Sequence, residues 1–246
     1  MRLDLLITER KLVKSRNIAT ELIKEGKVLI NGQIINKPAK DFTDSPDLKI
    51  EILEQPKYVG RGGLKLEKAL LEFKINPTDL ICLDVGSSTG GFTDCLLSNG
   101  AKKVYAVDVG TEQFDSELRK NPKIILMEQT DIRDVKNLPD SIDLAVIDVS
   151  FISLELILPA VKSLLNKNGL IIALIKPQFE TKKEDKNKSG IVRTDEIREQ
   201  VLENIKNYCQ KINLEILGII ESPILGGSGN KEYLLFLSCA EDARGF

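Results

Sequence analysis

The chain has 246 residues, and its 35 Lys and Arg against 37 Asp and Glu give a formal net charge of −2. This balance argues against a protein that coats nucleic acid by charge alone. At roughly 150 residues per domain, the length predicts one medium domain and one small module. No run approaches the ~18 uncharged apolar residues that a membrane span needs, so we expect a soluble protein.

Histidine is absent from the sequence. This excludes imidazole general bases, Ser-His-Asp and Cys-His nucleophilic systems, and zinc held by histidine. Proton transfer would have to use Lys, Asp, Glu, Tyr or Cys. The cysteines show no CxxC spacing, and the N-terminus carries charges where a signal peptide would be apolar, so we expect free thiols and a cytoplasmic location. The cysteines are Cys82, Cys95, Cys209 and Cys239.

The first forty residues are basic. Apolar residues at helical spacing predict a helix over 17–24 that ends before Gly26. Two β-prone runs around Asn31-Gly32 predict a hairpin, because Asn-Gly is a strong turn signal. Taken alone, Lys11, Lys14 and Arg16 are better explained as a solvated helix face.

The basic segment resembles the small RNA-binding domain of the ribosomal protein S4 type. The matching residues are Arg2-Leu3-Asp4, Ser15-Arg16, Ala19, Leu22-Ile23, Gly26, Val28, Asn31-Gly32 and Lys37-Pro38. The resemblance implies a helix pair that presents basic residues to structured RNA. The residues expected to contact RNA are Arg2, Lys11, Lys14, Arg16, Lys27, Lys37 and Arg61.

A stretch rich in Asp, Ser and Pro follows from Phe42 to Tyr58, interrupted by an expected strand at 48–53. Pro56 marks a linker near 54–60. We therefore expect an RNA-binding domain at 1–57 and a second domain at 58–246.

The second domain alternates helices with strands. We expect helices at 64–73, 90–98, 152–165 and 194–212, and strands at 80–85, 103–107, 123–127, 142–148 and 170–175. This alternation predicts a parallel sheet covered on both faces. Two further expected strands, at 214–220 and 233–237, flank the glycine-rich turn Gly226–Asn230 and predict a hairpin with one antiparallel edge. The fold class is α/β: a Rossmann-like domain with a seven-stranded, mostly parallel sheet and one antiparallel strand, preceded by a small α+β domain.

A glycine-rich segment, Asp84–Thr93, closes the first strand of this domain and opens a helix, where ligands bind in open α/β sheets. Asp84 could accept from a cationic amine, Asp108 from ribose hydroxyls and Asp131 from an adenine amine. Three carboxylates after three successive strands favour S-adenosylmethionine over NAD as the cofactor, because no phosphate has to be seated. A glycine turn with ordinary exposed aspartates is the alternative. The expected cofactor-binding residues are Asp84, Gly86, Ser88, Gly90, Gly91, Phe92, Asp108 and Asp131.

The segment after the fourth strand narrows the kind of methyl transfer. Enzymes that methylate the amino groups of bases place an Asn/Asp-Pro-Pro-aromatic motif there, whereas this chain reads Asp148-Val149-Ser150-Phe151. Methylation at carbon five of pyrimidines needs a cysteine nucleophile, and no cysteine lies near this loop or the end of the fifth strand. Both classes are disfavoured. Asp148 and Lys176 end two predicted buried strands at the ligand side instead.

Four segments resemble the Lys-Asp-Lys-Glu set of FtsJ-type ribose 2′-O-methyltransferases: RGGLKLEKAL (61–70), DVSFISL (148–154), LIKPQFE (174–180) and GNKEYL (229–234). They map that set onto Lys65, Asp148, Lys176 and Glu232. Together with the basic N-terminal domain, the resemblance narrows to the TlyA family of hemolysin A-like rRNA 2′-O-methyltransferases. It implies S-adenosylmethionine-dependent transfer to a cytidine ribose in ribosomal RNA, without a metal. Lys176 would take the hydroxyl proton, and Glu232 would orient Lys65 or the ribose.

Two other functions stay open. A membrane-damaging hemolysin would need a spanning or long amphipathic segment, and the sequence shows none. A non-catalytic RNA-binding factor in ribosome assembly would keep its effect without the four residues. The segment 181–190 is mixed in charge, and we expect either a mobile loop that closes on RNA or a solvated loop. The sequence does not decide the target nucleotide, the ribosomal subunit or the oligomeric state.

Overall fold

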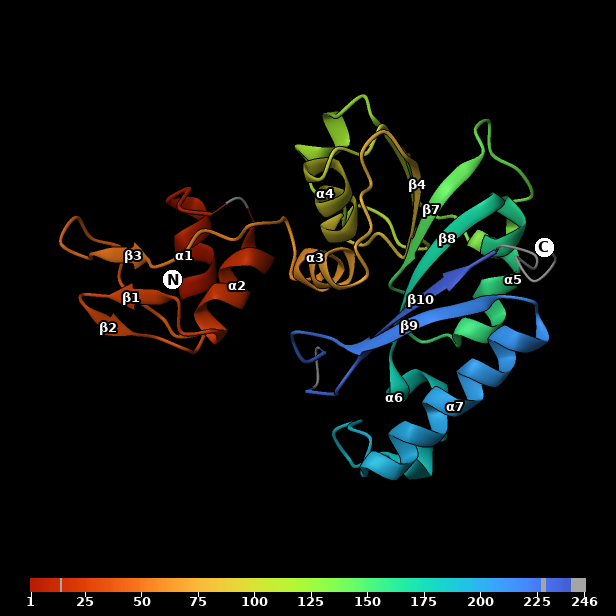
Figure 1. Cartoon of the computed structure of the whole chain (residues 1–246). Coiled ribbons are helices and arrows are strands. Elements are labelled where there is room, and N and C mark those ends of the chain that lie inside the picture. The colour runs from red at the N-terminus through yellow and green to blue at the C-terminus, as the bar shows by residue number, and fades with distance from the viewer. Residues whose placement is uncertain (14, 227–228, 240–246) are drawn as a thin grey trace. The chain divides into compact units, whose positions relative to one another are not determined.

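A computed structural model of the chain describes residues 1–13, 15–226 and 229–239 (Figure 1). The described residues form two units, one from Met1 to Gly60 and one that begins at Arg61. The division falls close to the expected domain boundary between 57 and 58, which stays a prediction. Lys14 and the middle of the expected glycine-rich turn, Gly227-Ser228, lie outside the described residues.

The first unit packs two helices against a small antiparallel sheet. Helix α1 spans Leu3–Glu9 and α2 spans Arg16–Lys24, and the strands, in the order β2-β1-β3, span Gln33–Ile34, Val28–Ile30 and Ile50–Ile52. Helix α2 starts where Ser15 accepts a hydrogen bond from the Ile18 amide, the usual role of a serine N-cap. The β1–β2 turn has positive φ at Asn31 and Gly32, which a two-residue hairpin turn requires. The predicted helix and hairpin are therefore confirmed, while β3 is shorter than expected.

The second unit contains a seven-stranded sheet in the order β6-β5-β4-β7-β8-β10-β9 (Figure 1). Its strands are β4 Ile81–Val85, β5 Lys103–Val107, β6 Ile124–Met127, β7 Ile142–Ile147, β8 Leu165–Ile175, β9 Glu215–Glu221 and β10 Tyr233–Ser238. The predicted strands are confirmed, except that β8 begins five residues earlier than expected, directly after its preceding helix.

The expected antiparallel edge is confirmed, since β9 and β10 pair as a hairpin at one side of the sheet. Strand β10 is antiparallel to both neighbours and lies between β8 and β9. Strand β10 is almost wholly buried, whereas β9 is partly exposed along its length. The more apolar strand therefore takes the position where it can pair on both sides, and β9 forms the edge.

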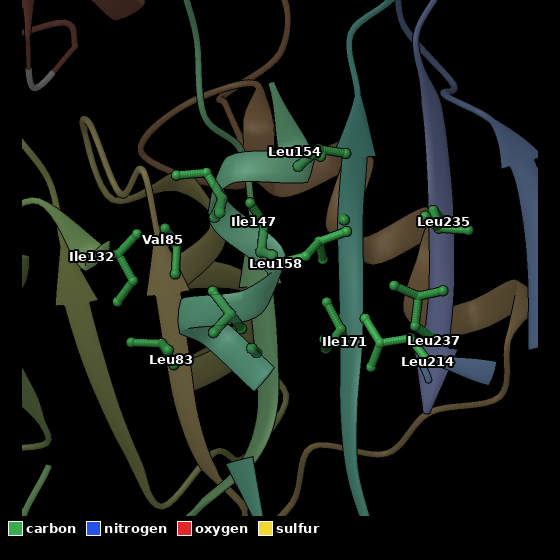
Figure 2. Packing of buried hydrophobic residues seen from close by; sticks show 14 of the residues in the cluster. Leu83, Val85, Ile132, Ile147, Leu154, Leu158, Ile171, Leu214, Leu235 and Leu237 are labelled. Atoms are coloured by element: carbon green, nitrogen blue, oxygen red, sulfur yellow. The ribbon is translucent and has the colours of Figure 1, made fainter. Parts of the chain in front are cut away.

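Helices cover both faces of this sheet (Figure 1). Helices α3 (Gly62–Glu72) and α4 (Gly91–Ser98) lie on one face, and α5 (Leu154–Leu164) and α7 (Asp195–Lys211) lie on the other. Short elements are α6 (Pro177–Glu180) and the 3-10 turns η1 (Leu118–Lys120), η2 (Ile132–Asp134) and η3 (Lys183–Asp185). Figure 2 shows Leu154 and Leu158 of α5 packed among sheet residues such as Ile147 and Ile171. Burial on both faces explains why the central strands are mostly apolar, with one aspartate each in β4 and β7.

The cysteines are buried free thiols, as the lack of paired spacing predicts. Burial raises the pKa of the Cys82 and Cys209 thiols to about 12, so both stay protonated at neutral pH. Within the described ranges, no helix combines the length and apolar character of a membrane span.

The topology gathers several loops at one edge of the sheet. Strands β4, β5, β7 and β8 are parallel, so their carboxyl ends and the loops that follow share this edge. Strand β10 runs the other way and pairs Tyr233 with Ile175. The register therefore brings Glu232, just before β10, beside Lys176, just after β8.

Candidate active site

The glycine turn after β4 depends on backbone shapes that favour glycine. Gly86 and Gly90 have φ of +82° and +93°, in the left-handed region that side chains disfavour. A Cβ on Gly86 would lie 2.6 Å from the Asp148 carbonyl oxygen. Only glycine lets the β4 turn approach the loop after β7 this closely.

Asp108 joins this turn to the loop after β5. Its Oδ2 accepts from the Ser88 amide at 2.7 Å, and its Oδ1 accepts from the Gly110 amide at 2.7 Å. A cavity of about 380 Å³ opens beside these residues. The predicted residues that line it are Gly86, Ser88, Asp108 and Asp131. The other predicted residues, Asp84, Gly90, Gly91 and Phe92, do not belong to the lining and lie behind it, in β4 and at the start of α4.

Asp84 is fully buried at the end of β4. Its Oδ2 accepts from the Thr93 hydroxyl at 2.6 Å, while its Oδ1 is buried with no hydrogen-bond partner. Burial raises the pKa of Asp84 to about 7, and the negative charge of Asp148 adds to the shift. A buried acceptor without a partner is uncommon, which marks this carboxyl as a place where a donor or cation would be stabilised.

Two ion pairs bring the four predicted catalytic residues together. Lys65 on α3 contacts Glu232 Oε2 at 2.6 Å, and only 10% and 2% of the two side chains are exposed. Lys176 after β8 contacts Asp148 Oδ1 at 2.6 Å and donates a hydrogen bond to Ser150 Oγ at 2.8 Å.

A second cavity, of about 410 Å³, is lined by three of the four residues, Lys65, Lys176 and Glu232. Asp148 lines the first cavity. Ser150 and Phe151 line both cavities, so the two cavities adjoin at this loop. The ion pair of Lys176 with Asp148 bridges from one cavity to the other.

In the first unit, a buried carboxylate holds two of the predicted RNA-binding residues. Asp4, with 1% exposure, accepts from Arg2 Nη2 and from Arg16 Nε, both at 2.9 Å. Burial opposes ionisation of Asp4, but the hydrogen bonds from Arg2 and Arg16 outweigh it and lower its pKa. The guanidinium groups are thereby fixed in place while their side chains stay 43% and 49% exposed.

Known protein families match both units of the chain. The FtsJ-like methyltransferase family model matches residues 58–239, and the S4 domain model matches residues 1–43. Hemolysin A of Brachyspira hyodysenteriae is 41% identical over 95% of this chain and 98% of its own length. The 16S/23S rRNA (cytidine-2′-O)-methyltransferase TlyA of Mycobacterium tuberculosis is 37% identical over 98% of this chain and 91% of its own. The chain belongs to the TlyA family. A solved structure of a hemolysin candidate from Streptococcus thermophilus matches with a TM-score of 0.79 and 41% identity, covering 98% of this chain and 89% of that one.

The remaining predicted RNA-binding residues of this TlyA family member differ in their surroundings. Lys11 and Lys37 are exposed. Lys27 is half-buried and pairs with Glu54 at 2.8 Å and with Glu25 at 3.4 Å, so its charge is already balanced. Arg61 is half-buried and belongs to the second unit, and its expected contact with RNA stays a prediction.

Asp131 also has partners within the chain. Its carboxylate accepts from the Arg133 amide at 2.9 Å and pairs with the Arg133 guanidinium at 2.6 Å. The hydrogen bonds from Arg133 lower the pKa of Asp131, so it stays ionised. An adenine amine at this position would share the carboxylate with Arg133.

Phe151 is a site residue that the sequence did not assign to a role. It is 90% exposed and has a φ of +64°, a rare backbone shape for an aromatic residue. Its ring packs on Phe179 with 4.8 Å between centroids. An aromatic residue in the loop between a buried strand and a capped helix is the only signal that could have pointed to it.

Residues 181–193 contribute Lys186 and Gly190 to the lining of the second cavity. Hydrogen bonds connect this segment to neighbouring parts of the site. Lys186 donates to the Gln178 carbonyl at 2.7 Å. Asn230, with 2% exposure, accepts from the Val192 amide at 2.9 Å and donates to the Gly190 carbonyl at 3.1 Å. These bonds give a defined place to a segment that we expected to be mobile, and its mobility stays a prediction.

Asp84 should make the stability of the ligand-free protein depend on pH. A free Asp has a pKa of ~3.9, whereas buried Asp84 titrates near 7. Between these values the folded state holds a proton that the unfolded state has lost, so the contribution of Asp84 to stability falls as pH rises from about 4 to about 7. Urea unfolding from pH 5 to pH 8 should show a steeper loss for the wild type than for Asp84→Asn. Equal slopes for the two proteins would contradict this expectation.

Proposed function

We propose that this protein is an S-adenosylmethionine-dependent rRNA (cytidine-2′-O)-methyltransferase that methylates the ribose of a cytidine. One observation carries the proposal: Lys176, held by Asp148 and Ser150, lies where a cofactor-sized cavity adjoins a second cavity lined by Lys65 and Glu232. The names of the TlyA relatives from Mycobacterium tuberculosis and Campylobacter jejuni support the substrate class.

The first cavity fits the cofactor. Its volume of about 380 Å³ lies within the range of small-molecule sites. The backbone turn at Gly86 and Ser88 would lie against the cofactor, with Asp108 toward the ribose and Asp131 toward the adenine. Each carboxylate oxygen that already accepts one hydrogen bond has a second lone pair for a ligand. Asp84 does not line this cavity. Its unpaired Oδ1, in the β4 strand beside the cavity, would stabilise a cationic amine there.

S-adenosylmethionine supplies a methyl group on a positively charged sulfur. The work of the chain is to align the ribose hydroxyl and to remove its proton. Lys176 Nζ donates to Ser150 Oγ and lies in an ion pair with Asp148 Oδ1, and these two contacts fix its direction. In the neutral amine the lone pair on Nζ would be available to the substrate hydroxyl and would accept its proton.

Lys65 and Glu232 complete the second cavity. The Lys65 cation would stabilise the negative charge that develops on the ribose oxygen, because electrostatic stabilisation is strong in a site that excludes water. Glu232 holds Lys65 in place at 2.6 Å. The exposed ring of Phe151 offers a stacking surface for a nucleobase, an interaction worth ~1–3 kcal/mol.

The first unit would supply affinity for RNA. Arg2 and Arg16 are held side by side on Asp4, and fixed guanidinium groups suit phosphate recognition. Lys11 and Lys37 are exposed on the same unit, and Lys14 and Arg61 are proposed to add phosphate contacts. Lys27 is the weakest candidate because Glu54 and Glu25 already neutralise it.

Methyl transfer to separated ribosomal subunits tests the proposal. The purified protein is incubated with tritium-labelled S-adenosylmethionine and either subunit, and the labelled nucleosides are identified by mass spectrometry after digestion. We expect label on 2′-O-methylcytidine, and label on a base would contradict the proposed chemistry. The relatives are named for 16S/23S or for 23S rRNA, and the labelled subunit decides between these targets. Leakage of liposomes exposed to the same preparation tests the hemolysin alternative.

A further inference from the structure

Glu180 links two segments of the site without lining either cavity. It ends α6, four residues after Lys176, and its carboxylate reaches the start of α5. Its Oε2 accepts from the Ser153 hydroxyl at 2.6 Å, and its Oε1 accepts from the Leu154 amide at 2.8 Å. The first segment, with Lys176, is thus tied to the second, which carries Asp148 and Ser150.

Capping of the N-terminus of α5 does not by itself explain why the Glu180 carboxylate lies there. Ser153 already caps α5, because its Oγ accepts from the Glu155 amide at 3.1 Å. Burial raises the pKa of Glu180, which means that its environment disfavours the charge. The helix therefore has its cap from Ser153, and Glu180 adds a connection at an electrostatic cost.

The connected loop needs to be held. Phe151, in its middle, has a φ of +64°, and such strain persists only where the surroundings fix the backbone. At one end the loop is fixed by the contacts of Asp148 and Ser150 with Lys176. At the other end it is fixed by the bonds of Ser153 and Leu154 with Glu180.

We propose that Glu180 is a positioning residue that holds the loop after β7 where Asp148 and Ser150 can orient Lys176. This inference rests on the proposed function, because it takes Lys176 as the group that accepts the hydroxyl proton. A misplacement of about 1 Å can cost ~100-fold in rate. Because Glu180 itself lines neither cavity, its loss should act through the displaced loop. It should lower kcat, and a rise in the KM for RNA should come only together with that fall.

Two substitutions of Ser153 distinguish its contact with Glu180 from its role as the N-cap of α5. Aspartate and asparagine both cap helices well, so α5 should stay capped in S153D and in S153N. Only the asparagine amide can donate to Glu180, whereas an aspartate would place a second negative charge against it. At pH 8 we expect kcat to fall at least ~10-fold in S153D, as for a loop displaced by a fraction of an ångström, and to stay within ~3-fold of wild type in S153N.

Substitutions of Glu180 itself provide the second comparison. In E180Q the side-chain oxygen can accept from Leu154 and the amide can donate to Ser153, so both contacts persist and most of kcat should remain. E180A loses both contacts, and its kcat should fall as in S153D. E199Q is the control, because Glu199 is an exposed carboxylate on α7, remote in sequence from these loops.

Wild-type kcat in folded S153D or E180A, equal losses in S153D and S153N, or a rise in KM without a fall in kcat would each overturn the inference. If E180A does not fold, the two Ser153 variants carry the comparison. Crystal structures of S153D and S153N provide a readout independent of activity, since the distance from Lys176 Nζ to Asp148 Oδ1 should lengthen only in S153D. An unchanged distance would overturn the role of Glu180, whereas a wild-type protein that transfers no methyl group would overturn the proposed function.

Discussion

Replacing Lys176 with alanine should reduce methyl transfer by about 10²–10⁴-fold, the usual contribution of a general base. The amine that would accept the ribose proton is lost, and no histidine exists in the chain to substitute for it. Single-turnover transfer from labelled S-adenosylmethionine to ribosomal subunits measures the rate constant directly. The matched control is Lys206→Ala, which removes a partly exposed lysine paired with Glu203 on α7.

Lys176→Arg separates the charge of this residue from its ability to lose a proton. Arginine keeps the contact with Asp148 but is not deprotonated in proteins, so the variant should fold and bind RNA yet be as inactive as the alanine variant. Activity close to wild type in Lys176→Arg would show that the residue acts by charge and not as a base. If inactive Lys176 variants kept the full biological effect in cells, the non-catalytic RNA-binding factor would be the better account.

The positions of the strands along the chain could be predicted, because they depend on the local pattern of apolar residues. Runs such as Ile81–Val85 and Ile142–Ile147 are apolar except for one aspartate in each, Asp84 and Asp143, as expected of strands buried on both faces. The place of β10 in the sheet could not be predicted in this way. Insertion of a strand between two others depends on which strand gains more by pairing on both sides, and this follows from tertiary packing.

In the candidate site, too, some residues could be predicted from the sequence and others could not. Lys65, Asp148, Lys176 and Glu232 were expected from their resemblance to a known set, and the structure pairs them as Lys65–Glu232 and Lys176–Asp148. Residues that act through long-range contacts gave no signal of their own. Asp4 and Asn230 are buried polar residues: Arg16 lies 12 residues from Asp4, and the partners of Asn230 lie 38 and 40 residues away. Their role becomes visible only once the fold brings these partners together.

The buried pair of Lys65 and Glu232 should respond strongly to the loss of one partner. Glu232→Ala leaves the Lys65 ammonium in a site where only 10% of its side chain is exposed. Breaking a buried pair in this way costs ~3–5 kcal/mol, because the remaining charge is uncompensated. Urea unfolding should show this loss. Glu72→Ala is the matched control: Glu72 pairs with Lys68 on the same helix, but both side chains are nearly half exposed, and such pairs are worth ~0.2–1 kcal/mol.

Replacing both partners distinguishes stability from chemistry. In the double variant Lys65→Met, Glu232→Leu, no unpaired charge is buried, and apolar replacement of a whole buried pair is often neutral for stability. We therefore expect the double variant to recover most of the free energy of unfolding lost in Glu232→Ala, while methyl transfer stays absent because the cation beside the ribose oxygen is gone. Recovery of both stability and methyl transfer would show that the pair only holds α3 against β10. Recovery of stability alone would place Lys65 and Glu232 in the reaction, since a folded protein with an intact Lys176–Asp148 pair would then lack only the charge that stabilises the developing oxyanion.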